Sequence, residues 1–176
     1  MLQVLKLAAV GAPTLLSLGS AVGADNLPSP DFTQGDAERG QQVYQRVGGC
    51  VTCHGWAGDG QSGRSPVAHA AAANLRETRL DPQGLYDTIR CGIPGTQMPY
   101  HDGAAYRDDR CFGMVMSDFA PGQQPVRGKT FRERQMVDLI AYLQKYVIGH
   151  GRPTLDECVQ YFGKSADKAC AYLKDN

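Results

Sequence analysis

The chain has 176 residues, including 21 Gly, 10 Pro and 6 Cys, and its 18 basic residues balance its 18 acidic ones. This length predicts one domain with a hydrophobic core and an appendage, rather than two domains. The balanced charge offers no clustered basic face, which argues against nucleic acid as a partner.

The N-terminal segment, residues 1–24, has one Lys, an apolar middle and the small residues Val22-Gly23-Ala24 at its end. This layout predicts a secretory signal peptide that is cleaved after Ala24. The alternative is an uncleaved membrane anchor, because the uncharged run from Leu7 to Ala24 just reaches spanning length. Cleavage leaves 17 basic and 18 acidic residues, and export places the cysteines where disulfides form.

Polar and Pro-rich residues 25–35 predict an extended leader, and residues 36–47 predict the first helix with Asp36 as its N-cap. The inward face of this helix carries Gly40, Val43, Tyr44 and Val47. Residues 55–80 are expected to be mostly loop, because the segment is interrupted by several glycines and a proline.

Two further helices are predicted before residue 150. Asp81 caps one that begins at Pro82 and ends before Gly92. The strongest helical pattern lies within residues 130–149, opened by a Thr130/Glu133 capping box. Its apolar stripe consists of Met136, Leu139, Ile140, Leu143 and Val147.

The remaining segments are a long loop and a short tail. Residues 100–129 show no sustained period, which indicates a loop with short helical turns. In the tail, a Thr154/Glu157 capping box and Ser165 open two short helices that meet at Gly163. Because no segment predicts a strand, the expected fold class is all-α.

The motif Cys50-Val51-Thr52-Cys53-His54 puts two thiols three positions apart with a histidine directly after them. Two thiols so spaced can form thioether links to haem, while the imidazole takes one axial position on the iron. The alternatives are half of a zinc site and a redox dithiol. Zinc commonly needs a second paired set of ligands, and a dithiol needs a strand-to-helix junction, so haem is favoured.

A second axial ligand is predicted at Met98. Gly92 and Gly95 let the backbone approach a flat ring, and Pro99 holds the preceding residue extended. The alternatives are a Met that fills the core and bis-histidine ligation. The candidate histidines for the latter are His69, His101 and His150.

These parts together resemble a class I c-type cytochrome of the bacterial periplasm. They follow the family's order over about residues 35–148, from "GDAERGQQVY" and "CVTCH" to "GIPGTQMPY" and "MVDLIAYLQKY". The resemblance implies an all-α, cytochrome c-like fold of about four to five helices around one covalent haem c. The domain spans residues 36–149, and residues 150–176 form a helical hairpin extension.

The same resemblance implies specific contacts. The first and last helices cross closely, which places Gly40 and Tyr44 against Leu139 and Tyr142. The carbonyl of a loop proline, matched here by Pro66, accepts the Nδ1–H of His54.

The four cysteines outside the motif are predicted to form two disulfides. Cys91 and Cys111 bracket Met98 and would clip its loop, while Cys158 and Cys170 lie on the two arms of the tail hairpin. The alternative is a free thiol that acts as a redox switch or a thiolate ligand. Trp56, the only tryptophan, is expected to donate its indole N–H to a haem propionate or to cover the ring edge.

The predicted function is periplasmic electron transfer, with His54 and Met98 as the ligands of the iron. The resemblance implies a periplasmic dehydrogenase as donor, such as a quinoprotein alcohol dehydrogenase, and another cytochrome or a terminal oxidase as acceptor. The rival function is a haem enzyme or enzyme subunit, for example in sulfur-compound oxidation. A third is a mainly structural cytochrome subunit of a larger complex.

Overall fold

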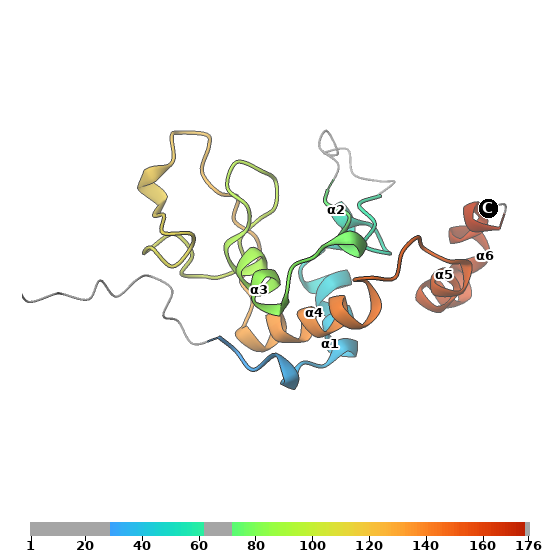
Figure 1. The fold of residues 1–176 in the computed structure, drawn as a ribbon. Helices are drawn as coiled ribbons and strands as arrows, with labels where there is room; N and C mark the ends of the chain where they lie inside the picture. The colour runs from blue at the N-terminus through green and yellow to red at the C-terminus, as the bar shows by residue number, and fades with distance from the viewer. Residues whose placement is uncertain (1–28, 62–71, 175–176) are drawn as a thin grey trace, which may run out of the picture.

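The computed structural model describes residues 29–61 and 72–174, which are helical with long connecting loops (Figure 1). The α-helices are α1 Ala37–Gln42, α2 Val51–His54, α3 Pro82–Cys91, α4 Glu133–Tyr146, α5 Leu155–Phe162 and α6 Ala166–Ala169. The 3₁₀ turns are η1 Phe32–Gln34, η3 Leu75–Glu77, η4 Met116–Asp118, η5 Gly163–Ser165 and η6 Ala171–Leu173. The described residues contain no named strand, only two isolated β-bridges, so the predicted all-α class is confirmed.

The main core lies where α1 and α3 pack against α4. Its buried apolar side chains recur three and four positions apart in α3 and α4, as expected for helices with one inward face. They are Val43, Tyr44, Leu85, Tyr86, Ile89, Phe131, Met136, Leu139, Ile140, Tyr142, Leu143 and Val147. The predicted apolar stripe of the last domain helix is therefore confirmed as the centre of the core.

The first predicted helix is divided in two. After α1 the chain widens into a π-helical turn, η2 Val43–Val47, in which the Gly48 N–H donates to the Val43 carbonyl at 2.8 Å. Asp36 caps α1 as predicted, through a 2.8 Å bond from the Arg39 N–H. A π turn differs from an α turn by one residue, which the apolar pattern does not reveal, and such turns are frequent next to functional sites.

Helices α1 and α4 cross in direct backbone contact at Gly40. A Cβ atom on residue 40 would lie 1.9 Å from the Asp138 carbonyl oxygen and 2.7 Å from the Tyr142 Cβ. The Tyr44 and Tyr142 ring centroids are 5.4 Å apart. The predicted contacts of Gly40 and Tyr44 with Tyr142 are thus confirmed.

The carboxylate of Asp138, which is almost fully buried, links the two helices. It accepts hydrogen bonds from the Asp36 N–H at 2.8 Å and from two guanidinium nitrogens of Arg39 at 2.8 and 2.9 Å. Burial raises the pKa of Asp138, but the bonds from Arg39 and Asp36 outweigh it and leave the pKa below its ordinary value.

The predicted cap of α3 is confirmed, whereas that of α4 is wrong. Asp81 accepts the Gly84 N–H at 2.7 Å, directly before Pro82. Helix α4 begins later than the Thr130/Glu133 capping box implied, and Gln135 accepts the Arg132 N–H at 2.9 Å. Phe131 lies outside the helix, where its N–H donates to the His101 carbonyl at 2.9 Å and its ring stacks on the His101 ring.

Between α3 and α4 the chain forms a small second core instead of regular structure. A disulfide joins Cys91 to Cys111, with an S–S distance of 2.08 Å. Tyr106 is buried against this pair and donates its hydroxyl to the Cys91 carbonyl at 2.7 Å. This contact and the disulfide fix the loop to the end of α3.

The C-terminal tail is a helical hairpin, with α5 followed by α6. A disulfide joins Cys158 to Cys170 at 2.07 Å, and both residues are fully buried. The Thr154/Glu157 capping box is confirmed, with bonds of 3.2 and 2.8 Å, but Ser165 makes no side-chain cap. Figure 1 shows the tail (red) beyond the C-terminal end of α4 and the 100–129 loop (yellow) at the opposite end of the molecule.

Candidate haem site

The two thiols and the imidazole of the motif lie on one face of a single helical turn. Cys50 is the N-cap of α2, and the His54 N–H donates to its carbonyl at 2.8 Å. In a helical turn, positions i, i+3 and i+4 share a face, so Cys50, Cys53 and His54 are presented together. The spacing of the motif therefore places the two thiols and the imidazole on a common face of the turn.

The turn ends at a glycine, whose carbonyl accepts a hydrogen bond from a buried tyrosine. Gly55 directly after His54 has a φ of 77°, and a Cβ there would lie 2.8 Å from the Gln61 carbonyl oxygen. Tyr44, which is fully buried, donates its hydroxyl to the Gly55 carbonyl at 2.7 Å. This bond connects the α1/α4 crossing to the residue next to His54.

The orientation of the His54 ring is set by a backbone carbonyl. Its Nδ1 lies 3.0 Å from the Ala73 carbonyl oxygen. Because a carbonyl only accepts, Nδ1 carries the proton and Nε2 keeps the lone pair that a metal requires. Burial lowers the pKa of His54, although the bond to Ala73 opposes this, so the ring is favoured in its neutral form.

The acceptor differs from the one expected. Pro66 lies outside the described residues, and the carbonyl that meets His54 belongs to Ala73, seven positions later. The Leu75 N–H in this segment donates to the Gly58 carbonyl at 2.7 Å, and the loop that carries Gly58 is itself closed by a 2.9 Å bond from the Gly60 N–H to the His54 carbonyl. The assignment to Pro66 is therefore corrected to Ala73.

The thiols of the motif do not suit the two alternative sites. Burial raises the pKa of Cys50 to about 11, whereas a redox dithiol needs an attacking cysteine with a lowered pKa. Among the described residues, no three His, Cys, Asp or Glu side chains gather as a metal site would require. Cys50 and Cys53 are also the two cysteines that remain unpaired, which leaves both free for thioether links.

Met98 lies on a loop that closes on itself. The Ile93 N–H donates to the Met98 carbonyl at 3.2 Å, and the Met98 N–H donates to the Thr96 hydroxyl at 3.1 Å. Gly92 makes this closure possible, because its φ is 63° and a Cβ there would lie 2.7 Å from the Met98 carbonyl oxygen. The loop therefore fixes the backbone of Met98 from both sides.

The loop is also anchored at both ends. Cys91, directly before Gly92, carries the disulfide to Cys111. After Met98, the His101 N–H donates to the Arg90 carbonyl at 3.0 Å, and the Tyr100 N–H donates to the Val126 carbonyl at 2.9 Å. These attachments tie the Met98 loop to α3 and to the second half of the long loop.

The structure gathers the motif residues on α2 and keeps Met98 on a separate segment. Figure 1 shows α2 and the light-green loop that follows α3 on the same side of α4. Met98 lies on the loop after α3, whereas His54 lies on α2, so the two predicted ligands come from different parts of the chain.

Two of the three alternative histidines are engaged elsewhere. The Nδ1 of His101 lies 2.7 Å from the Lys129 carbonyl oxygen, and its buried ring stacks on Phe131 at 4.0 Å. The Nε2 of His150 lies 3.1 Å from the Lys145 carbonyl oxygen. The third, His69, lies outside the described residues.

Trp56 contacts the tail. Its indole N–H donates to the Tyr172 hydroxyl at 2.9 Å, and its ring lies 5.4 Å from Tyr161 and 5.6 Å from Phe162. The N–H that was expected to reach a haem propionate is therefore bonded to the tail. The tail hairpin instead covers the segment that follows the haem motif.

Sequence reasoning missed two residues near His54. Ala73 acts through its carbonyl, which every residue possesses, so no sequence signal identifies it. Arg76 is only 3% exposed and donates to the Ala57 carbonyl in the loop after the motif. Its only local sequence signal is Asn74, whose side chain accepts the Arg76 N–H at 3.0 Å.

Comparison with known families agrees with this site. Residues 35–115 match the family model described as "Cytochrome C oxidase, cbb3-type, subunit III", a span that includes α1, α2, α3 and the Met98 loop. The match over residues 35–115 supports a c-type cytochrome domain with a haem-based role in electron transfer. No curated protein and no solved structure matches the chain.

Proposed function

We propose that the protein is a periplasmic electron carrier with one covalently bound haem c. The observation that carries the proposal is the common face of α2, where Cys50, Cys53 and His54 are presented together and Nδ1 of His54 is committed to a carbonyl. Cys50 and Cys53 would hold the haem through thioether links, and Nε2 of His54 would bind its iron.

Met98 is the second ligand in this proposal. Its loop is closed by its own hydrogen bonds and clipped by the Cys91–Cys111 disulfide, so the position of the thioether does not depend on the haem alone. When bound, the haem supplies a reversible one-electron couple, and a neutral sulfur ligand favours its reduced form. With both axial positions filled, small molecules have no open position on the iron.

The partners follow from the same chemistry. A carrier exchanges electrons through small, transient contacts, with a periplasmic dehydrogenase such as a quinoprotein alcohol dehydrogenase as donor. Another cytochrome or a terminal oxidase is the acceptor, and the oxidase is supported by the name of the matching family. Apolar side chains exposed around the long loop are available for such contacts: Ile93, Phe112, Met116 and Val126.

The proposed location is the periplasm, after removal of residues 1–24. Their composition and the two disulfides, Cys91–Cys111 and Cys158–Cys170, support export to an oxidising compartment. Within the described residues, no helix has the length and apolar character needed to cross a membrane. N-terminal sequencing of the purified protein tests this, and a first residue of Asp25 is the expected result.

The axial ligands are tested by visible and near-infrared spectroscopy of the purified haem protein. The parent is expected to show a sulfur-to-iron charge-transfer band and no carbon monoxide adduct in its reduced state. Met98→Ala should lose the band and bind carbon monoxide, whereas the more exposed Met116→Ala, the matched control, should behave as the parent. Rapid adduct formation by the parent would show an open iron and support the rival function, a haem enzyme.

A further inference from the structure

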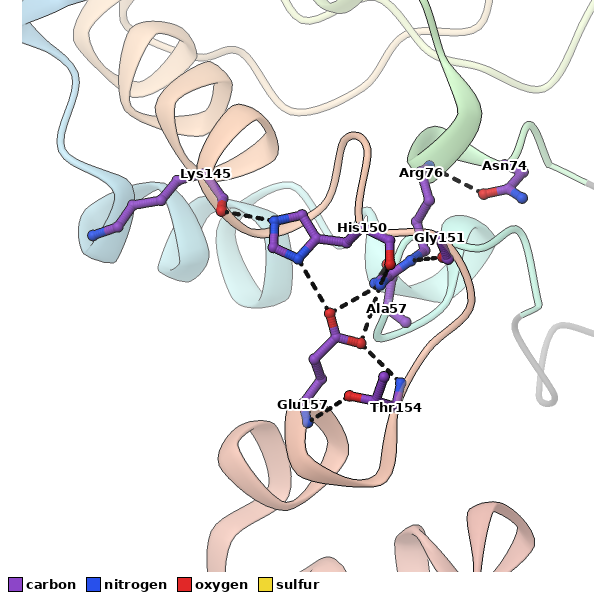
Figure 2. Close-up of polar contacts among 8 residues, drawn as sticks. All are labelled: Ala57, Asn74, Arg76, Lys145, His150, Gly151, Thr154 and Glu157. Atoms are coloured by element: carbon purple, nitrogen blue, oxygen red, sulfur yellow. Dashed lines mark hydrogen bonds and ion pairs between the residues drawn. The ribbon is translucent and has the colours of Figure 1, made fainter. Parts of the chain in front are cut away.

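Arg76 is a buried cation at the junction of three segments (Figure 2). Its Nη1 donates to the Ala57 carbonyl at 3.2 Å, and its Nη2 donates to the His150 carbonyl at 3.1 Å. Its Nε donates to the Gly151 carbonyl, and Nη2 also contacts both carboxylate oxygens of Glu157, at 2.9 and 3.0 Å. One guanidinium thus joins the loop after the haem motif, the end of the domain and the tail.

Glu157 is held in place for this pairing. Its Oε2 accepts the Thr154 N–H at 2.8 Å, and its Oε1 lies 3.3 Å from Nδ1 of His150. Burial raises the pKa of Glu157, but the bonds from Thr154 and Arg76 outweigh it and leave the pKa lowered. The carboxylate is therefore ionised at neutral pH and compensates the charge of Arg76, which is costly to bury alone.

The backbone around Arg76 leads directly to His54. Arg76 follows Ala73 by three positions, and the Leu75 N–H between them donates to the Gly58 carbonyl at 2.7 Å. The carbonyl of Arg76 itself accepts the Gly149 N–H at 2.9 Å. The segment that carries the acceptor of the His54 ring is therefore fixed on both its backbone and its side chains.

We infer that Arg76 is a positioning residue for His54, because it fixes the segment whose Ala73 carbonyl holds the imidazole. The inference rests on the proposed function of His54 as axial ligand. Because Arg76 pairs with Glu157, the C-terminal tail also contributes to the orientation of His54. A histidine that donates its second N–H to an acceptor is a more basic ligand, and outer partners of this kind tune a metal centre.

The first test is Arg76→Lys, which keeps the charge but removes the planar fork that reaches several acceptors. The variant should raise the reduction potential, because a weaker bond from His54 to Ala73 makes the ring a poorer donor to the oxidised iron. Exchange of the His54 Nδ1 proton should accelerate about three- to tenfold, the range for loss of a hydrogen bond between neutral groups. Arg79→Lys, in the same segment at an exposed position, is the matched control and should change neither quantity.

A milder variant, Glu157→Gln, tests the same inference if Arg76→Lys does not fold. It removes the charge partner of Arg76 while retaining an amide oxygen for the Thr154 N–H, and it should accelerate exchange of the His54 ring proton to a smaller degree. Asp156→Asn removes the same charge from the neighbouring exposed position and should leave the exchange unchanged.

The outcomes distinguish failure of the inference from failure of the proposed function. If the Leu75 and Gly149 amides exchange faster in Arg76→Lys while the His54 ring proton and the potential stay as in the parent, Arg76 only anchors the tail and the inference is overturned. If the parent lacks histidine ligation, the proposed function fails. The nitrogen chemical shifts of the His54 ring then still report whether Arg76 maintains the Nδ1–H tautomer, since this readout does not need the haem.

Discussion

Gly40 of α1 and Asp138 of α4 are in backbone contact, because a Cβ on residue 40 would lie 1.9 Å from the Asp138 carbonyl oxygen. The atom in the way is backbone and cannot rotate aside. Any side chain at position 40 therefore forces the two helices apart, and with them the core that supports the haem motif.

Gly40→Ala is expected to lower the free energy of unfolding by about 2 kcal/mol or more, in the range of overpacked cores. Gly84→Ala in α3 is the control, because its Cβ would meet only side-chain atoms, at 3.2 Å. Its gain in helix propensity offsets that contact, so a change below about 1 kcal/mol is expected. Denaturant unfolding measures both, and equal stability of the two variants would contradict the close crossing.

Asp138 makes part of the stability depend on pH. Its pKa is lowered in the folded state, so its contribution is present above its unfolded pKa near 3.8 and is lost as the pH falls through the folded value. Asp138→Asn should lose about 1–3 kcal/mol at neutral pH, the cost of a disrupted buried bond to a charged group.

Unfolding of this variant at several pH values between 6 and 3 is expected to show a shallower loss of stability than the parent. Asp156→Asn removes an exposed carboxylate and serves as the charge-matched control. A parent-like pH slope in Asp138→Asn would rule out this source of acid sensitivity.

The two disulfides allow a matched comparison. Alkylation of the denatured haem protein should label no thiol before reduction and four afterwards, and four thiols labelled without reduction would exclude both bridges. Replacing Cys91 and Cys111 together with Ala should destabilise the protein by about 3 kcal/mol, and so should replacing Cys158 and Cys170, since the closed loops are similar in length.

Only the first pair of replacements should weaken Met98 as a ligand. The Cys91/Cys111 variant should lose the sulfur-to-iron band at a lower denaturant concentration than global unfolding, because its loop is no longer clipped to α3. The Cys158/Cys170 variant should lose the sulfur-to-iron band at the same denaturant concentration at which it unfolds. Identical behaviour of the two would show that the first disulfide has no specific role at the ligand.

Gly92 is expected to be the most sensitive position of the Met98 loop. Gly92→Ala places a Cβ 2.7 Å from the Met98 carbonyl oxygen and should remove the sulfur-to-iron band or displace it. Gly95→Ala is the control, with a similar positive φ of 77° but open space around the added atom. An intact band in Gly92→Ala would show that the loop tolerates a different closure.

Local signals in the sequence predicted much of this fold. Asp81 before Pro82, the Thr154/Glu157 pair and the face that contains Gly40 depend on neighbours three or four positions away, so the sequence shows them directly. The predicted start of α4 was wrong, because Phe131 packs and bonds against His101, a contact across 30 positions that no local pattern shows.

The parts of the site that consist of side chains could be predicted from the sequence. The parts that consist of backbone groups could not. Cys50, Cys53 and His54 form a recognisable pattern of residue types. The carbonyl of Ala73 cannot be recognised in this way, because every residue has a backbone carbonyl. The pairing of Arg76 with Glu157 spans 81 positions and depends on how the tail packs, which no local pattern determines.

The packing of Trp56 under the tail gives the protein an internal optical probe. It is the only tryptophan, it lies two positions after His54, and its indole bonds to Tyr172. A haem attached at Cys53 would quench its emission by energy transfer while the chain is folded. Release of the tail alone would expose the indole to water yet leave it beside the haem, so a shift in emission colour without a gain in intensity would distinguish undocking from unfolding.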